Sequence, residues 1–320
     1  MKRRCSGDVK NIQVGIVILN YITWADTECC IKSIRDTLRM ITYKIYLVDN
    51  ASPILPNSEI QSFIRNSIDI VFILSEKNCG YAAGNNIGIE KALGDGCGFI
   101  LVTNNDIVFQ KECIANMIKA FNIYDKVGII GPLVINAGKE IQKSTNFHEG
   151  GLKQKYIAET LLRKLYPKYR MKCFGRDSDY HKTAFVYSVS GCCFMLSNIC
   201  AGRITPLDEN TFLYCEEAII GKQMKKAGFK TLYYPEVSVI HKHGSSTSYV
   251  GAFSYVCRVS SELYYCKRYL GSNMLSILPL YIIRSLSYLM HSILKKDYRN
   301  NLGFYFKKTF HKLINGDKWQ

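Results

Sequence analysis

Short apolar segments alternate with longer amphipathic segments through the first 135 residues, and this alternation constrains the fold more than any other feature of the chain. Residues 14–19 form a continuous apolar run rich in β-branched side chains, typical of a strand buried on both faces. Residues 27–40 then carry apolar side chains at helical spacing, and residues 44–48 form the next strand-like run. Strands separated by helices need crossover connections, which favour parallel pairing. We therefore predict an α/β fold with a mostly parallel central sheet flanked by helices.

The same patterns predict the remaining elements. In chain order they are a helix at 58–66, a strand at 70–74, a helix at 84–93, a strand at 98–102, a helix at 111–124 and a strand at 127–130. Residues 136–182 are basic and polar with little periodicity, which indicates a long, mobile loop region. Strand-like runs return at 185–196, 231–234 and 237–240, with a helix after 207–214.

Polar side chains stand where the predicted strands end. Asn20, Asp49, Asn78 and Asp106 each follow an apolar run. The carboxyl ends of parallel strands share one edge of a sheet, and α/β proteins bind phosphorylated ligands at that edge. A carboxylate such as Asp106 can hold a divalent cation against phosphate oxygens there. A plain strand-ending turn remains the alternative for Asp49 and Asp106, because Asn and Asp are common turn residues.

Residues 78–88 form a glycine-containing loop that enters the next predicted helix. Gly80 and Gly84 permit close approach of the backbone, and the amides at a helix N-terminus favour an anion. The spacing does not match G-x-G-x-x-G, so the loop does not indicate a dinucleotide site. A tight turn without a ligand remains the alternative.

Two further clusters carry groups that suit proton transfer or metal binding. Glu216 and Glu217 are adjacent in a predicted helix, so they point in different directions and one of them can serve as a general base. His241 and His243 follow an apolar run and face the same side of an extended chain, where both imidazoles can reach a cation. The alternatives are a solvated acidic pair in a first helical turn and ordinary loop or core histidines.

The C-terminal region is both basic and apolar. The chain has a formal net charge of +16, and half of it lies in residues 250–320, where 11 Lys/Arg stand against 3 Asp/Glu. Residues 274–294 are long enough to span a bilayer, but Pro279, Arg284 and His291 interrupt them. We predict an amphipathic segment on the cytoplasmic leaflet; a helical subdomain packed on the core, or a homodimer contact, is the alternative. The basic residues expected to face anionic lipid are Lys295, Lys296, Arg299, Lys307 and Lys308.

The thirteen cysteines are scattered, odd in number and without a C-x-x-C pair. They include the adjacent pairs Cys29–Cys30 and Cys192–Cys193, which suit reduced thiols better than zinc ligands or disulfides. No uninterrupted apolar segment follows the charged N-terminus, so we expect no secretory signal. We therefore expect a cytoplasmic protein, peripheral on the inner face of the membrane where the tail binds lipid.

In chain order, eight motifs closely resemble those of glycosyltransferase family 2, and in particular its bacterial rhamnosyltransferase-like group. The motifs lie at residues 14–21, 48–52 (Val-Asp-Asn-Ala-Ser), 78–86 (Asn-Cys-Gly-Tyr-Ala-Ala-Gly-Asn-Asn), 103–106 (Thr-Asn-Asn-Asp), 190–193 (Ser-Gly-Cys-Cys), 212–217 (Phe-Leu-Tyr-Cys-Glu-Glu), 226–229 (Lys-Ala-Gly-Phe) and 239–241 (Val-Ile-His). The resemblance implies a GT-A fold for residues 12–248, between an N-terminal tail (1–11) and a basic, amphipathic, helical C-terminal region (249–320).

The resemblance also implies an activity. The chain would be an inverting glycosyltransferase of the hexosyltransferase class that moves one sugar from a UDP-, GDP- or dTDP-linked donor to a saccharide acceptor in bacterial surface polysaccharide synthesis. Enzymes of this kind often use lipid-diphosphate-linked acceptors. Asp49 would contact the nucleobase, and Asp106 with His241 would hold Mg²⁺ or Mn²⁺ on the diphosphate. The residues implied to bind the nucleotide sugar are Asn20, Asp49, Asn78, Gly80, Gly84, Asn85, Asn105 and Asp106.

The family's base motif falls on Glu216-Glu217, which places the general base at Glu217. Two departures affect this picture: the base motif is Glu-Glu rather than Glu-Asp, so either residue can be the base, and residues 104–106 (Asn-Asn-Asp) carry one carboxylate. The Gln-x-x-Arg-Trp motif of processive synthases is absent, which favours transfer of a single sugar.

Two alternatives from other functional classes stay open. A sugar nucleotidyltransferase would need a Gly-rich, basic loop after the first strand, and residues 20–24 offer none. A basic nucleic-acid-binding protein would explain the net charge, but strand-end carboxylates would repel phosphate unless a cation is bound.

Overall fold

The structure is a computed structural model of the chain, and it describes residues 13–38, 40–158, 164–165, 168–169, 175, 178–242 and 251–314. The predicted N-terminal tail and His243 lie outside these residues. The strands are β1 (Val14–Asn20), β2 (Tyr43–Asp49), β3 (Ile70–Leu74), β4 (Phe99–Asn104), β5 (Ile107–Phe109), β6 (Val127–Asn136), β7 (Ala184–Val186), β8 (Cys193–Ser197) and β9 (Lys230–His241). The helices are α1 (Trp24–Thr37), α2 (Ser58–Arg65), α3 (Tyr81–Gly94), α4 (Cys113–Ile123), α5 (Leu152–Ala158), α7 (Asn198–Ile204), α8 (Glu216–Ala227), α9 (Gly251–Arg268), α10 (Met274–Leu294), α11 (Lys296–Asn300) and α12 (Leu302–Ile314).

The strands form one sheet in the order β3-β2-β1-β4-β8-β6-β9-β5, with β7 paired to β9. The β3-β2-β1-β4 half is parallel, as the crossover argument predicts. The other half is mixed, because β8 runs antiparallel to both β4 and β6, whereas β6 and β9 are parallel. The predicted α/β architecture is confirmed, and its parallel part is the half that contains β1 and β2.

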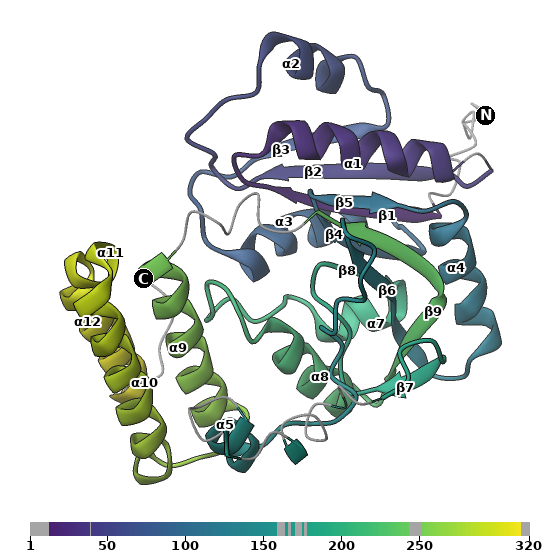
Figure 1. Cartoon of the computed structure of the whole chain (residues 1–320). Coiled ribbons are helices and arrows are strands. Elements are labelled where there is room, and N and C mark those ends of the chain that lie inside the picture. Colours follow the sequence, from purple (N-terminus) through teal and green to yellow (C-terminus); the bar gives the residue numbers. More distant parts are fainter. Residues whose placement is uncertain are drawn as a thin grey trace, which may run out of the picture.

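Helices cover both faces of the sheet and create two apolar cores (Figure 1). Alternate side chains of β1 serve the two cores: Ile16 and Ile18 pack with α1 and α4, whereas Val17 packs with α3, α7 and α8. Gly15 has no room for a side chain, since a Cβ there would lie 2.8 Å from the Cβ of Ala92 in α3. This burial on both faces explains why β1 reads as an uninterrupted apolar run.

The strand registers bring the polar strand ends together. Asn20 pairs with Asp49 across β1 and β2, and Leu19 pairs with Asn104 across β1 and β4. After β4 the chain turns into β5, which pairs antiparallel with β9 and places Ile107 opposite His241. Residues 230–241 form one strand with a register shift against β6, rather than the two predicted strands. His241 at the end of β9 therefore reaches the same edge of the sheet as Asn20, Asp49 and Asn104.

The predicted C-terminal region folds into a helical bundle of α9, α10, α11 and α12, which packs through α9 beside the part of the chain that contains the sheet (Figure 1). Arg284 of α10 is buried, and its guanidinium donates to both carboxylate oxygens of Glu262 in α9, at 2.7 and 2.9 Å. Lys155 of α5 lies 3.9 Å from the same carboxylate. A buried charge needs such partners, so α10 is a packed bundle helix on the side that carries Arg284.

The opposite side of α10 is apolar and exposed. Its exposed large side chains are Met274, Leu275, Ile282, Leu286, Leu289, Met290, Ile293 and Leu294, and those of α12 are Phe306, Phe310 and Ile314. Positions 275, 282, 286, 289 and 293 follow helical spacing, so they form one stripe. Within the described chain, α10 is the one helix long and apolar enough to cross a membrane by length and composition. We call this exposed set the apolar face.

Candidate functional site

Asn20 joins the ends of β1 and β2 to the turn after β4. Its side-chain amide donates to Oδ1 of Asp49 at 2.8 Å, and its side-chain oxygen accepts from Thr27 Oγ1 at 2.8 Å and Asn105 Nδ2 at 3.1 Å. All four side chains are buried. Three of the predicted site residues, at positions 20, 49 and 105, therefore belong to one hydrogen-bonded network at the expected edge of the sheet.

Asp49 has hydrogen-bond donors for both of its carboxylate oxygens. Oδ1 accepts from Asn20 and from the hydroxyl of Ser52, and Oδ2 accepts from the backbone N–H of Ser52 at 3.2 Å. The Ser52 hydroxyl in turn accepts from the backbone N–H of Ile22 at 2.8 Å. Only 1% of Asp49 is exposed, so its first effect is to fix the two loops that follow β1 and β2. Contact with a nucleobase stays a prediction for this residue.

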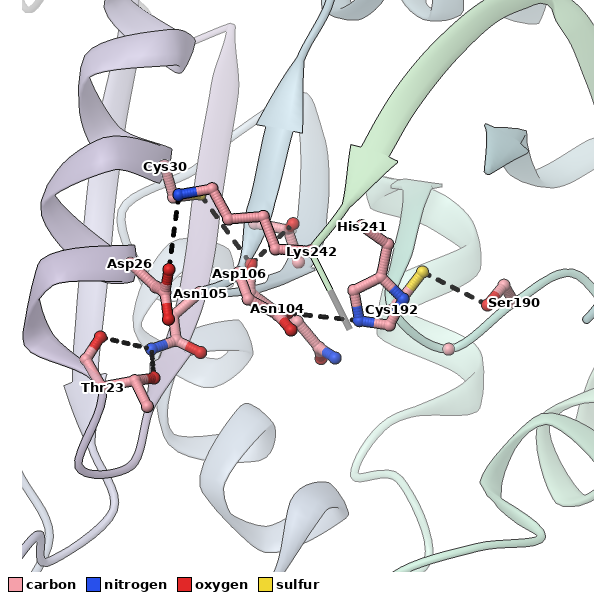
Figure 2. A network of polar contacts seen from close by, with 12 residues as sticks. Thr23, Asp26, Cys30, Asn104, Asn105, Asp106, Ser190, Cys192, His241 and Lys242 are labelled. Atoms are coloured by element: carbon pink, nitrogen blue, oxygen red, sulfur yellow. Dashed lines mark hydrogen bonds and ion pairs between the residues drawn. The ribbon is translucent and has the colours of Figure 1, made fainter. Parts of the chain in front are cut away.

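Asn105 explains why the metal motif carries an amide where a second carboxylate was expected. Its Nδ2 lies within 3.1 Å of four oxygens: Asn20 Oδ1, Thr27 Oγ1, and both the carbonyl and the hydroxyl oxygen of Thr23. Figure 2 shows the contacts with Thr23. Two of these oxygens, the Asn20 amide oxygen and the Thr23 carbonyl, only accept, so a carboxylate at this buried position would face them without a donor of its own. The local environment thus selects an amide, which holds the β1–α1 loop against the turn after β4.

Asp106 and His241 face each other at the same edge (Figure 2). Asp106 Oδ1 lies 3.3 Å from His241 Nε2, and the backbone N–H of Lys242 donates to the carbonyl of Asp106 at 3.0 Å. His241 Nδ1 lies 2.9 Å from Oε1 of Gln142. Because an amide oxygen only accepts, this contact suits a proton on Nδ1. Nε2, which faces Asp106, would then be the ring nitrogen able to coordinate a cation. A carboxylate oxygen and an imidazole nitrogen so arranged suit a divalent cation.

The protein supplies few further metal ligands at this point. No group of three or more His, Cys, Asp or Glu side chains in the described ranges has metal-binding geometry. Asp106 and His241 would therefore contribute two ligands, and substrate oxygens and water would complete the shell, as is usual for Mg²⁺. Lys242, the next residue, pairs with Asp26 in the first turn of α1 at 3.3 Å, which ties the end of β9 to α1 (Figure 2).

The predicted glycine loop is shorter than expected, because α3 begins at Tyr81 rather than Gly84. Asn78 Oδ1 accepts from Asn50 Nδ2 at 2.9 Å and from the N–H of Gly80 at 3.0 Å. Gly80 has φ +92°, and a Cβ there would lie 2.3 Å from the carbonyl oxygen of Phe212. The loop around Phe212 therefore requires glycine at position 80.

Gly84 and Asn85 lie inside the first turns of α3. A Cβ on Gly84 would lie 2.5 Å from Leu19 in β1, so this glycine allows close packing of helix on strand. Asn85 donates to the carbonyl of Tyr81 at 3.0 Å. Within the described structure, the side-chain oxygens of both Asn85 and Asn50 are buried without a hydrogen-bond partner. The ligand-binding roles of Gly80, Gly84 and Asn85 stay predictions.

Glu216 and Glu217 open helix α8 after two residues with left-handed backbone, Tyr214 (φ 73°) and Cys215 (φ 69°). Such conformations are unfavourable for residues other than glycine, and they set the direction in which the helix starts. Glu217 Oε1 accepts from the backbone N–H of Gly191 at 3.2 Å, and Tyr81 donates to the carbonyl of the same glycine.

The two glutamates differ in their surroundings. Burial and the neighbouring Glu217 carboxylate raise the pKa of Glu216 to about 8. Its Oε2 is buried, and no described group hydrogen-bonds to it. Burial also raises the pKa of Glu217, but the N–H of Gly191 and the positive charge of Lys155 oppose that rise. Burial thus favours the protonated form of both carboxyl groups, and Glu217 is the member of the pair whose charged form Gly191 and Lys155 stabilise.

A hollow of about 390 Å³ opens beside this edge, between the β1–α1 loop and the β2–α2 loop. Its lining residues are Ile22, Thr23, Trp24, Ala25, Asp26, Leu55, Pro56, Asn57 and Ile60. None of the predicted nucleotide-sugar residues lines it. Periodicity also missed the groups that hold the site together, namely Gln142, Ser52, Thr23, Thr27 and Lys155. Ser52, Tyr81 and Gly191 lie within recognised motifs, which could have drawn attention to them.

Comparisons with known proteins identify the family to which the chain belongs. The model of the family described as Glycosyl transferase family 2 matches residues 14–192, which is more than half of the chain. The chain therefore belongs to glycosyl transferase family 2, and it is a glycosyltransferase. The resemblance inferred from the eight motifs is confirmed, and the nucleotidyltransferase and nucleic-acid-binding alternatives do not describe its class.

Curated relatives and a solved structure are similar to the chain. An N-acetylglucosaminyl-diphospho-decaprenol L-rhamnosyltransferase from Mycobacterium tuberculosis is 22% identical over 217 residues, which are 63% of this chain and 67% of the relative. The low-salt glycan biosynthesis hexosyltransferase Agl10 from Haloferax volcanii is 29% identical over 208 residues, 64% of this chain and 59% of the relative. A crystal structure of GalNAc-T7 with UDP, GalNAc and Mn²⁺ superposes with a TM-score of 0.58 at 15% identity, covering 94% of this chain and 57% of that one. The predicted GT-A fold is thus confirmed.

Proposed function

We propose that the chain transfers a single sugar from a nucleotide-sugar donor to a saccharide acceptor carried on a lipid diphosphate, with inversion at the anomeric carbon. One observation carries the proposal: residues 191–192 contact both the helix that carries Glu217 and the end of the strand that precedes Asp106. The N–H of Gly191 donates to Glu217 at 3.2 Å, and the carbonyl of Cys192 accepts from the N–H of Asn104 at 2.8 Å, two residues before Asp106. A base in contact with this segment, and a cation-binding carboxylate two residues beyond its other contact, suit in-line displacement at a sugar between them.

In the proposed reaction, Glu217 accepts the proton of the acceptor hydroxyl while that oxygen attacks C1 of the sugar. The bond between C1 and the diphosphate oxygen breaks, and the diphosphate leaves. Asp106 and His241 would hold Mg²⁺ or Mn²⁺, which neutralises the charge of the leaving diphosphate when bound. Gln142 keeps the His241 ring oriented for that task. The donor would lie along the edge formed by Asn20, Asp49 and Asn78, with UDP, GDP or dTDP as its nucleotide.

The acceptor and the location follow from two further observations. The name of the mycobacterial relative states a diphospho-decaprenol acceptor, which supports a lipid-linked saccharide for this chain. The apolar face of α10 and α12 exposes eleven large side chains, and Lys295, Lys296, Arg299 and Lys307 are exposed close to it in sequence. An apolar surface with basic residues around it suits the anionic inner face of the cytoplasmic membrane. Lys308 departs from the predicted lipid-facing set, because its ammonium lies over the ring of Phe304, half-buried.

Donor binding is the first test. We expect one of the UDP-, GDP- or dTDP-sugars, with Mn²⁺, to raise the melting temperature by about 5 °C at a hundred times its dissociation constant, since such saturation adds about 2.7 kcal/mol. Asp106→Ala should remove the Mn²⁺-dependent part of that shift and lower turnover by roughly 10³-fold. Asp125→Ala, an exposed carboxylate in the α4–β6 turn, is the matched control. Normal turnover in Asp106→Ala would reject the site, and NMR of the product would test inversion.

Membrane binding is tested separately by co-sedimentation with vesicles of phosphatidylcholine, with and without phosphatidylglycerol. Replacing Leu286 and Ile293 by Gln should lower binding to the anionic vesicles about tenfold or more, because both apolar side chains lie on the exposed stripe. Leu55→Gln, which changes an exposed leucine in the β2–α2 loop, is the control. Equal binding by both variants would contradict the membrane assignment.

A further inference from the structure

The loop before helix α8 is held in place by side chains from two distant helices. We call residues 207–215 the base loop, because they lead directly into Glu216 and Glu217. On one side, Asn86 of α3 accepts from the N–H of Leu207 at 2.7 Å and donates to the carbonyl of the same residue at 2.9 Å. The beginning of the base loop is therefore fixed on α3.

Helix α9 holds the end of the base loop by hydrogen bonds. The hydroxyl of Ser261 donates to the carbonyl of Leu213 at 2.8 Å, and the hydroxyl groups of Ser254 and Tyr214 are hydrogen-bonded to each other. The two serines are about two helical turns apart, so they lie on the same side of α9. Two consecutive residues of the base loop are therefore bound to one side of one helix.

The first turn of α8 also packs against α9 (Figure 1). Ile219 is 1% exposed and belongs to one apolar cluster with Tyr265 of α9. The hydroxyl of Tyr187 donates to the carbonyl of Ala218 at 2.7 Å and lies 3.2 Å from the hydroxyl of Tyr265. The segments before and after the two glutamates are therefore both tied to α9.

The backbone between these contacts has a conformation that needs support from its surroundings. Tyr214 has φ 73° and Cys215 has φ 69°, in the left-handed region that is unfavourable for residues other than glycine. Such residues persist only where neighbouring groups hold them. The hydrogen bonds from Ser254 and Ser261 end at Tyr214 and at the residue before it, so they are placed to hold this turn. Because the turn sets the direction in which α8 begins, it also sets where the carboxylate of Glu217 lies.

We propose that α9 positions the general base, and that Ser254 and Ser261 are its positioning residues. This role rests on the proposed function, in which Glu217 accepts the proton of the acceptor hydroxyl. Both serines would act through the backbone of the base loop and would keep Glu217 Oε1 within reach of the N–H of Gly191, 3.2 Å away. A displaced turn would move the carboxylate away from the reacting hydroxyl. α9 lies outside residues 14–192, which the family model matches.

The test compares adjacent serines of α9. Ser261 and Ser260 are both buried, but the hydroxyl of Ser260 has no hydrogen-bond partner among the described residues. We expect Ser261→Ala to lower kcat about 10-fold, and Ser254→Ala/Ser261→Ala about 100-fold, because small displacements of a reacting group have large effects on rate. Ser260→Ala should keep kcat within about twofold of wild type. KM for the donor, and the rise in melting temperature that the donor causes, should stay unchanged in all three variants.

Two further variants examine the left-handed turn itself. Ser254→Thr keeps the hydroxyl that contacts Tyr214 and should retain most of kcat. Glycine adopts a positive φ without strain, so adding Cys215→Gly to Ser254→Ala/Ser261→Ala should recover about 10-fold in kcat. Circular dichroism shows whether each variant is folded. Ser254 is half-buried, so Ser254→Ala provides the same comparison if Ser261→Ala fails to fold.

The outcomes separate this role from the proposed function. Equal kcat values for Ser261→Ala and Ser260→Ala, a loss of donor binding that matches the loss of kcat, or no recovery with Cys215→Gly would overturn the role of α9 while leaving glycosyl transfer intact. A wild-type protein that transfers sugar equally well after Glu217→Gln would remove the base and its positioning residues together. A wild-type protein that binds no nucleotide sugar and transfers none would overturn the proposed function itself.

Discussion

Asp49 and the Glu216–Glu217 pair are carboxylates of the candidate site that differ in the hydrogen-bond donors around them. Asp49 is almost completely buried and has donors for both oxygens, from Asn20 and Ser52. Glu216 has a buried oxygen that no described donor reaches, and its pKa is raised to about 8. Hydrogen bonds to a carboxylate stabilise the charged form, whereas burial without them favours the proton. The hydrogen bonds of Asp49 therefore make the edge of the sheet rigid, whereas the burial of Glu216 leaves a carboxyl group that can exchange a proton.

The largest expected effect comes from removing the proton acceptor. Glu217→Gln should lower kcat about 10³-fold while donor binding and melting temperature stay close to wild type, because general-base catalysis contributes factors of this size. Glu216→Gln should cost roughly tenfold, through the lost influence on its neighbour. Single-turnover transfer and a thermal-shift titration with donor measure both, with Glu90→Gln on the exposed side of α3 as the control. If Glu216→Gln proves the more damaging change, the base is Glu216.

A smaller effect is expected from a change at Asn105, which belongs to the hydrogen-bonded network around Asp49. Asn105→Asp would restore the second acid that family motifs often carry, but its carboxylate would face oxygens of Asn20, Thr23 and Thr27. We expect the free energy of unfolding to fall by about 2 kcal/mol, the cost of a buried group without its hydrogen bonds. Affinity for Mn²⁺ should not rise. Urea unfolding and a metal titration check both points, and tighter Mn²⁺ binding without loss of stability would show that position 105 is a vacant ligand position.

The smallest effect is a dependence on pH. Since the pKa of Glu216 is higher in the folded protein than the ordinary value of 4.5, the folded state binds more protons between pH 4.5 and about 8. Its contribution to stability is therefore lost as pH rises through that window. The wild type should lose more of its free energy of unfolding than Glu216→Gln when the pH rises from 5 to 8. Urea unfolding at the two pH values measures the difference, and parallel behaviour of the two proteins would mean that Glu216 is ionised throughout.

Part of the fold and part of the site could be predicted from the sequence. Apolar runs ending in Asn20, Asp49 and Asp106 predict side chains that meet at one edge, because parallel strands force that meeting. Periodicity likewise places Arg284 in a long apolar helix. Neither pattern identifies partners that come from distant segments, such as Gln142 for His241 or Glu262 for Arg284. Those pairs depend on how loops and helices pack, and the four oxygens around Asn105 are visible only once the β1–α1 loop is folded.

The ion pair between Glu262 and Arg284 has a consequence for how the protein is made. α10 is a 21-residue apolar segment of the kind that can be inserted into a membrane during synthesis, and Arg284 is its one Lys or Arg residue. Glu262 comes 22 residues earlier, so the ribosome has already released the counter-charge when the arginine emerges. The nascent helix can then fold back on α9, with its charge neutralised and its other side left exposed. The order of two residues along the chain thus favours a helix packed in the bundle over one that is threaded through a bilayer.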